Sequence, residues 1–166
     1  MKQLADLVVT GEDRIIRILH GYTVGRGYAK YTSTLEEAWR MSVSVLSSLL
    51  AQCCANWDEP PELGPDMDYP QDPLAQFGII EAQRHRERGI DIGMFLGLLK
   101  YYRQSYLDLV MEAGFEPDDY EVCRRFVDRF YDRIELGICT EWTMGMSGRI
   151  CRISAVRSIP VMCGMV

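Results

Sequence analysis

Apolar side chains that recur at three- and four-residue steps constrain the fold of this chain more than any other feature. The longest such stripe lies between Asp91 and Gly114, a stretch that would span roughly 34 Å as an α-helix at about 1.5 Å per residue. Asp91 is of a type that caps helix N-termini, and Gly114 of a type that ends helices. The pattern therefore predicts a long amphipathic helix. Its stripe consists of Ile92, Phe95, Leu96, Leu99, Tyr102, Tyr106, Leu109 and Val110.

Four other stretches show the same helical spacing. Capping-box spacing is found at Thr10 with Asp13, and again at either Ser33 with Glu36 or Thr34 with Glu37. Two helices are therefore expected to begin there. Gly89 is expected to end or bend a further helix. The four predicted helices cover residues 10–31, 33–57, 74–88 and 123–142.

The chain is thus predicted to be all-α, a helical bundle in which strand is confined, if present, to the residues after Trp142. Beyond that residue the composition changes to arginines, β-branched residues and no acidic residues. Residues 1–142 are therefore expected to form one domain, and residues 143–166 a tail or the start of a linker to an output domain. The expected core residues are Trp39, Phe95, Leu99, Phe126 and Phe130.

The segment from Asp58 to Pro73 holds five of the seven prolines and six acidic residues. Proline lacks the backbone donor that a helix or a central strand needs, so the segment is predicted to be a long loop. Loops of this length inside a domain are often functional or mobile. A solvated connector is the simpler of the two readings.

Composition excludes several classes of protein. No apolar run approaches the roughly 18 to 20 residues that a membrane span needs, and acidic residues come too early for a signal peptide, so a cytoplasmic protein is expected. The net charge of −6 argues against nucleic-acid binding, which relies on basic residues. Six irregularly spaced cysteines, two of them adjacent, indicate buried free thiols rather than a disulfide framework.

No catalytic or metal-binding motif stands out. The chain has neither a phosphate-binding loop with its lysine nor a CxxC or HxxxH pair, so no catalytic residue, metal ligand or cofactor is assigned. His85 has Arg84, Arg86 and Arg88 beside it, which predicts an exposed helix face. His20 is expected to have a partly buried structural role.

An aromatic and aliphatic stripe could either pack the core or line a small apolar ligand pocket between helices, where helical bundles build their sites. Core packing is the simpler reading, and the ligand pocket remains the alternative. The residues of this alternative pocket are Phe95, Leu99, Tyr102, Tyr106, Phe126 and Phe130.

Three segments, YAKYTSTLEEAWRMSVSVLSSLL, HRERGIDIGMFLGLLKYYRQSYLDLV and CRRFVDRFYDRIELGICTEW, resemble the N-terminal all-helical sensory domains of bacterial cytoplasmic histidine kinases and of stressosome-type sigma-factor co-antagonists. In the second group the turn that opens a long helix, here Arg88-Gly89-Ile90, belongs to a globin-like fold without haem. The resemblance implies a non-catalytic input module, often dimeric, that precedes an output domain. No phosphoacceptor motif of the kinase type follows His85.

Three functional hypotheses follow. The first is a non-catalytic sensory or protein-interaction domain in bacterial signal transduction. The second is a haem- or metal-binding globin-like sensor that uses His85 or His20, and the third is a small cysteine-dependent enzyme. A homodimer is expected, formed through the first or the last predicted helix, because apolar residues extend beyond one stripe on each. Those residues are Ile18, Val24, Tyr28, Tyr131 and Trp142.

Overall fold

The structure, a computed structural model, describes residues 1–24 and 36–154, and the side chains of residues 1–23 and 37–144. Within these ranges the chain is all-α and forms no strand, which confirms the predicted fold class. No described helix is both long and apolar enough to cross a membrane. The expected capping pair at Ser33, the soft boundary near residue 31 and the side chains of Val24 and Tyr28 lie outside these ranges. The elements are α1 (Lys2–Thr10), α2 (Glu12–Val24), α3 (Glu36–Asn56), the short 3-10 helix η2 (Tyr69–Gln71), α4 (Pro73–Glu87), α5 (Ile92–Glu112) and α6 (Pro117–Ser154).

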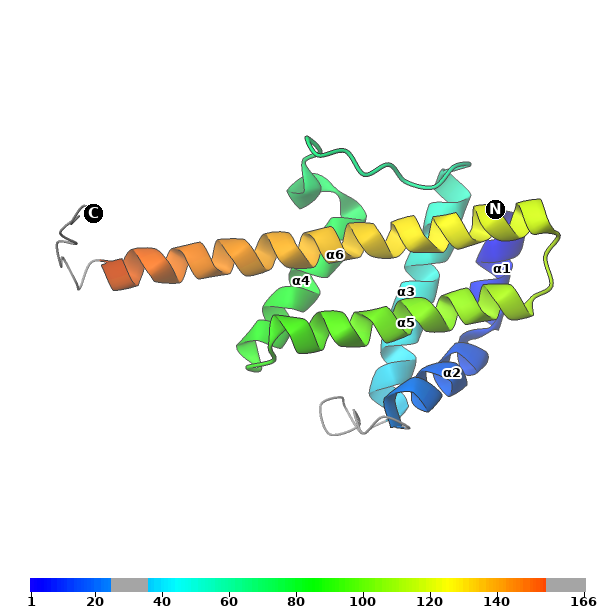
Figure 1. Cartoon of the computed structure of the whole chain (residues 1–166), viewed down its shortest axis with the longest axis horizontal. Helices are drawn as coiled ribbons and strands as arrows, with labels where there is room; N and C mark the ends of the chain where they lie inside the picture. The colour runs from blue at the N-terminus through cyan, green and yellow to red at the C-terminus, as the bar shows by residue number, and fades with distance from the viewer. Residues whose placement is uncertain (25–35, 155–166) are drawn as a thin grey trace, which may run out of the picture.

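The helices form one bundle, in which α6 packs against α4 and α5 (Figure 1). α5 and α6 run antiparallel and side by side, joined by a short turn, and α4 packs closely along α6. α1 packs against α3, and α2 packs against α5 and α3. The C-terminal part of α6 extends past the other helices, so this end of the helix projects from the bundle.

The α4–α5 corner forms as the sequence predicts. Gly89 has a positive φ of 75°, and its N–H donates to the carbonyl of Arg86 while the N–H of Ile90 donates to that of His85. This pair of hydrogen bonds is the Schellman arrangement, which requires a left-handed residue and therefore favours glycine. The Asp91 carboxylate then caps α5 by accepting from the N–H of Gly93 at 2.7 Å. The bend at Gly89 and the cap at Asp91 are both confirmed.

The start of the chain differs from the prediction. Thr10 does not begin a helix but ends α1, and its hydroxyl donates to the Asp6 carbonyl one turn back. Gly11 separates α1 from α2, and Leu4 and Val8 are fully buried on the first of these helices. The predicted helix is present as α2, which begins at Glu12 and not at Thr10, and the short helix α1 that precedes it was not predicted.

The last helix is also longer than predicted. α6 continues to Ser154, so the expected end near Trp142 was wrong. Gly145 and Gly148 each weaken a helix by about 1 kcal/mol relative to alanine, but neither removes a backbone hydrogen bond as proline would. The first proline after Pro117 is Pro160. The division into a domain and a tail or linker stays a prediction.

The core contains every residue that the periodicity placed there. Trp39, Phe95, Leu99, Phe126 and Phe130 are all buried, which confirms that prediction. Tyr131, expected to lie off the main stripe and to support a dimer surface, is instead 1% exposed. It packs edge-on against Tyr106 and Phe130, with ring centroids 5.7 and 5.3 Å apart.

α4 and α6 approach each other more closely than ordinary side chains allow. A Cβ atom on Gly78 would collide with the Ile134 carbonyl, and one on Gly137 would collide with the Ala75 backbone. Both glycines are therefore needed for the crossing, because they let the two backbones touch.

The acidic, proline-rich loop lies against α6 rather than being only a solvated connector. Arg133, which is 7% exposed, donates from Nε and Nη2 to the Glu62 carbonyl at 2.9 and 2.7 Å. Its Nη1 pairs with the Asp72 carboxylate, whose other oxygen caps α4 by accepting from the N–H of Leu74 and Ala75. One buried cation thus fixes both the loop and the start of α4.

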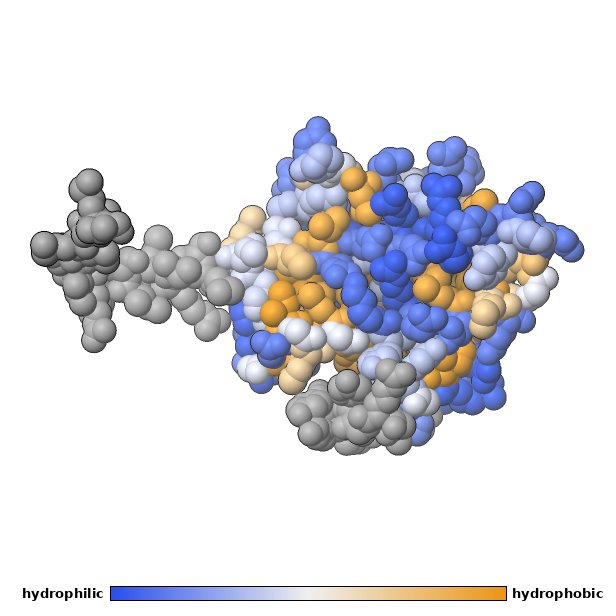
Figure 2. Space-filling model, in the orientation of Figure 1, coloured by the Kyte–Doolittle hydropathy of each residue, from blue (hydrophilic) through white to orange (hydrophobic). Residues whose placement is uncertain are grey.

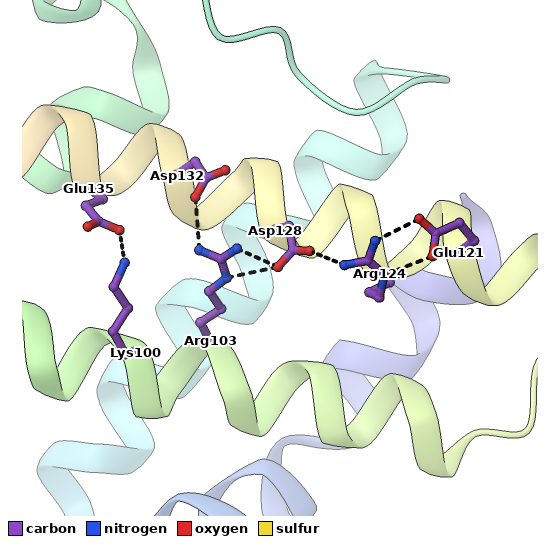
Figure 3. A network of polar contacts seen from close by, with 7 residues as sticks. All are labelled: Lys100, Arg103, Glu121, Arg124, Asp128, Asp132 and Glu135. Carbon is purple, nitrogen blue, oxygen red and sulfur yellow. Dashed lines mark hydrogen bonds and ion pairs between the residues drawn. The ribbon is translucent and has the colours of Figure 1, made fainter.

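A second set of charges joins α5 to α6 at the surface (Figure 3). Arg103 donates to Asp128 at 2.6 Å and to Asp132 at 2.9 Å, and Lys100 pairs with Glu135. Figure 2 shows the hydrophilic band over these helices, with hydrophobic surface toward the end of α5 that adjoins α4.

Candidate functional site

A pocket of about 530 Å³ lies where α3, α4 and α5 meet. Its volume falls in the range of small-molecule sites, which are commonly built between the helices of a bundle. α3 contributes Ala38, Trp39 and Ser42; α4 and the following corner contribute Glu81, His85, Arg88 and Ile90; α5 contributes Gly93, Met94, Phe95, Gly97, Leu98, Tyr101 and Tyr102.

Aromatic side chains make up much of the pocket wall. Trp39 and Phe95 are buried, while Tyr101 is half-buried and its ring stacks against that of Tyr22 with centroids 5.5 Å apart. Burial raises the pKa of Tyr102 to about 12, so its hydroxyl stays neutral at physiological pH. The wall is therefore apolar and carries few charges.

His85 faces this pocket and not open solvent. Its side chain is only 21% exposed, and its ring stacks on Phe95 with centroids 4.0 Å apart and planes 12° apart. The prediction of an exposed histidine was therefore wrong. Nδ1 lies 2.7 Å from the Glu81 carbonyl oxygen. Because a carbonyl can only accept, Nδ1 carries the proton, and Nε2 of the neutral ring is left as an acceptor.

The charged groups of the pocket are not all balanced. Glu81 pairs with Arg84 at 2.6 Å, so its charge is already compensated. Arg88 makes no ion pair and no side-chain hydrogen bond with any residue in the described parts of the chain. Glu81 and His85 lie four residues apart on one face of α4, and Arg88, the C-cap residue of that helix, lines the same pocket. The pocket thus has one uncompensated positive charge at its edge.

Gly97 leaves open space in the middle of α5. A Cβ atom built on it would have no heavy atom of the described residues within 4 Å. Alanine would stabilise the helix by about 1 kcal/mol at such a position, and no neighbour in the described chain prevents it. Unlike Gly78 and Gly137, this glycine is not explained by helix packing. A bound molecule that approaches the α5 backbone would explain it.

The sequence-predicted pocket residues divide between two places. Phe95 and Tyr102 line the pocket. The other four, Leu99, Tyr106, Phe126 and Phe130, are buried in the core. The Tyr106 hydroxyl, for example, donates to the Val43 carbonyl at 3.0 Å. A ligand role for the six together stays a prediction.

The sequence reading missed the contributions of α3 and α4. Spacing along a single helix cannot show which other helices close a cavity against it. One local signal was available: Gly93 and Gly97 lie four residues apart within a long helix, where glycine costs stability.

The cysteines whose side chains are described are free thiols. Cys53, Cys54 and Cys123 are buried and Cys139 is half-buried, which confirms the expectation of buried thiols for the first three. Burial raises the pKa of Cys53 and of Cys54 to about 12. A nucleophilic cysteine needs the opposite shift, so these two thiols are poorly suited to catalysis.

The second histidine lies elsewhere. His20 is exposed on α2, so the expectation that it is partly buried was wrong. Its ring meets Trp39 edge-on, with ring centroids 5.7 Å apart, and it does not line the pocket. Within the described side chains, no three residues among the histidines, cysteines and acids lie together as a metal-binding group.

Comparisons of the chain with protein-family models, with curated proteins and with solved structures gave no match.

Proposed function

We propose that this chain is a non-catalytic sensory or protein-interaction domain of bacterial signal transduction, whose input is a small molecule bound between α3, α4 and α5. The observation that supports it most is the pocket itself, which is lined by aromatic side chains and by Gly97, a glycine that no described neighbour requires. The likeness of three sequence segments to helical input domains of histidine kinases and sigma-factor regulators points the same way.

The signal would pass from the pocket to α6 through α4. α4 carries Glu81 and His85 of the pocket, and Arg88 of the pocket is its C-cap residue. It is fixed to α6 at its start by the Asp72–Arg133 pair, in its middle by the glycine contact, and near its end by Arg86. A ligand that moves α4 would therefore move α6 with it.

Arg86 is the link nearest the pocket. Its Nη2 lies 2.6 Å from a Glu141 carboxylate oxygen, and its Nη1 donates to the Glu141 carbonyl at 3.1 Å. Both side chains are about four-fifths buried (18% and 19% exposed), so the pair is more rigid than a surface ion pair. Past this point α6 leaves the bundle, toward an output domain or a partner protein in this proposal.

Binding of the neutral dye N-phenyl-1-naphthylamine tests the pocket. We expect a saturable rise in fluorescence at one site per chain, because the dye emits strongly only in an apolar environment. Gly97→Leu, which fills the space over α5, should abolish the rise. Gly21→Leu is the matched control, since Gly21 also has open space around it but lies on α2 outside the pocket. Equal binding by the wild type and the Gly97→Leu variant would refute the proposal.

A second candidate is a haem- or metal-binding sensor, favoured by one observation. The hydrogen bond from His85 Nδ1 to the Glu81 carbonyl leaves Nε2 as the nitrogen that could bind a metal, an arrangement common among ligating histidines. A Soret band that develops with haemin and is lost in His85→Ala but kept in His20→Ala would support this candidate.

A further inference from the structure

Resting on the proposed function, we propose that the pocket recognises an aromatic carboxylate, with its ring among the aromatic side chains and its carboxylate at Arg88. The proposal names the chemical class of the ligand, which the pocket volume alone does not give. Two features of the pocket support this class: the uncompensated positive charge at its edge and its flat apolar wall.

The positive charge comes from Arg88. This guanidinium lines the pocket and has no ionic or side-chain hydrogen-bond partner in the described structure. Arg88 is an exposed residue that caps the C-terminus of α4, whereas Arg84 and Arg86 within α4 pair with Glu81 and Glu141. Arginine presents a planar fork of donors that matches a carboxylate, so an anionic ligand group would satisfy it.

Two carboxylates lie near the same edge, and both are already engaged. Glu81 is held by Arg84 at 2.6 Å. Asp91 caps α5 through the N–H groups of Gly93 and Met94. Neither needs Arg88, so the guanidinium remains available to a ligand.

The rest of the pocket suits a flat apolar body. The His85 and Phe95 rings are nearly parallel, and Trp39, Tyr101 and Tyr102 add further aromatic surface around the same cavity. Gly93 and Gly97 place bare α5 backbone along one side, where a planar ring can approach more closely than a branched chain could. Aromatic rings pair favourably in stacked or edge-on contact.

The test compares 2-naphthoate with 2-naphthamide, which share a ring and differ in charge, by displacement of N-phenyl-1-naphthylamine from the full chain. We expect the naphthoate to bind more tightly than the amide. Arg88→Gln should weaken the naphthoate about five- to tenfold, the effect of losing one charge-assisted contact at an exposed residue, and should change the amide less than about twofold.

Arg125→Gln is the matched control, because it removes one exposed arginine from α6 at a site outside the pocket. It should leave the affinity for naphthoate unchanged. Circular dichroism and thermal unfolding of both variants show that the fold is kept.

The outcomes separate the two proposals. If both compounds displace the dye equally and Arg88→Gln affects neither, the pocket binds apolar ligands but the carboxylate class is wrong. If the dye itself binds no differently to wild type and Gly97→Leu, the proposed function fails as well. An equal loss of naphthoate binding in Arg88→Gln and Arg125→Gln would also overturn the assignment, because it would reflect net charge and not the pocket.

Discussion

At the scale of single residues, Arg133 illustrates how much structure one buried cation can organise. Its guanidinium holds the Glu62 carbonyl and the Asp72 carboxylate, and lies over the Trp57 ring at 5.6 Å. The pair with Asp72 is weak evidence for stability by itself, since desolvation of both charges offsets their attraction. Removal of only one of the two charged side chains is destabilising, because the other charge would stay buried without a partner.

We therefore expect Arg133→Met to lower the free energy of unfolding by about 3 to 5 kcal/mol, as measured by urea denaturation. Asp72→Asn added to that variant should restore part of the loss, because asparagine still caps α4 but carries no charge. Arg129→Met, on the same helix and half-buried, is the control and should cost much less. A double variant less stable than Arg133→Met alone would contradict this account.

Phe130 tests the register of α6 within the core. It is fully buried, so Phe130→Ala should cost about 3 to 5 kcal/mol through lost burial and the cavity left behind. Val122→Ala, on the same helix and 43% exposed, should cost little. A loss below about 1 kcal/mol for Phe130→Ala would show that this face of α6 is not in the core.

The buried thiols and phenols predict how stability changes at alkaline pH. Burial raises the pKa of Cys53 and Cys54 from 9.0 to about 12, and that of Tyr102 from 10.0 to about 12. The folded state therefore keeps protons that the unfolded chain loses. This stabilising contribution is fully present below about pH 9 and is lost as the pH rises toward 12.

We expect the urea midpoint to fall progressively above pH 9. The fall should be shallower in Cys54→Ala, which removes one of the shifted groups, than in the wild type. If the urea midpoint falls equally steeply with pH in the two proteins, the Cys54 thiol does not contribute to the loss of stability.

At the scale of elements, the α4–α6 crossing is the contact least tolerant of change. Gly78→Ala places a methyl group against the Ile134 backbone, which cannot rotate away as a side chain could. We expect a loss of about 3 kcal/mol, at the upper end for overpacking. The control Gly21→Ala adds the same methyl group where nothing lies within 4 Å and should stabilise the protein slightly. Thermal unfolding of both variants measures the difference, and a stabilising Gly78→Ala would disprove the close crossing.

Periodicity predicted most helices because an amphipathic stripe is a local property of the sequence. The prediction of where the first helix begins failed because the capping signal was ambiguous. Thr10 and Asp13 have the spacing of a capping box, yet Gly11 between them separates two helices. The Asp72 cap was also missed, since its second role depends on Arg133, 61 residues away.

His85 was misplaced for a different reason. The arginines at positions 84 and 86 are its sequence neighbours, but adjacent residues on a helix point about 100° apart and so do not share a face. Position 81, four residues earlier, lies on the same face of the helix and so indicates better what surrounds His85. The carbonyl of Glu81 is the group that His85 contacts. The pocket could not be predicted from spacing along the sequence, because α3 and α5 meet α4 only after folding.

At the scale of the whole molecule, the projecting end of α6 supports self-association. Helices gain most of their stability from packing, and a short isolated segment that contains Gly145 and Gly148 would be marginal in water. We propose that a second copy packs against this end in a two-fold dimer, the commonest form of association. Met144, which is 59% exposed where α6 leaves the bundle, would lie in that interface.

Sedimentation equilibrium should accordingly give a mass near twice 19.0 kDa at micromolar concentration. Met144→Lys should shift the equilibrium toward monomer, because a charge would be buried between the copies. Met111→Lys, at the far end of α5 and similarly exposed, should not. A monomeric mass for the wild type throughout the micromolar range would remove the dimer and leave a monomeric docking domain.

The two polar links between α4 and α6 also bear on the order in which the chain folds. Asp72 and Arg133 are 61 residues apart, and Arg86 and Glu141 are 55 apart. Closing such loops costs chain entropy before any contact forms, so both links depend on a distant part of the chain. During synthesis α4 is made long before its partner, and until α6 emerges Asp72 has no counter-charge and Gly78 no helix to touch. α6 follows the other described helices in the chain and completes the core that they share, so a nascent chain that stalls before residue 133 would expose an unfinished core to chaperones and proteases.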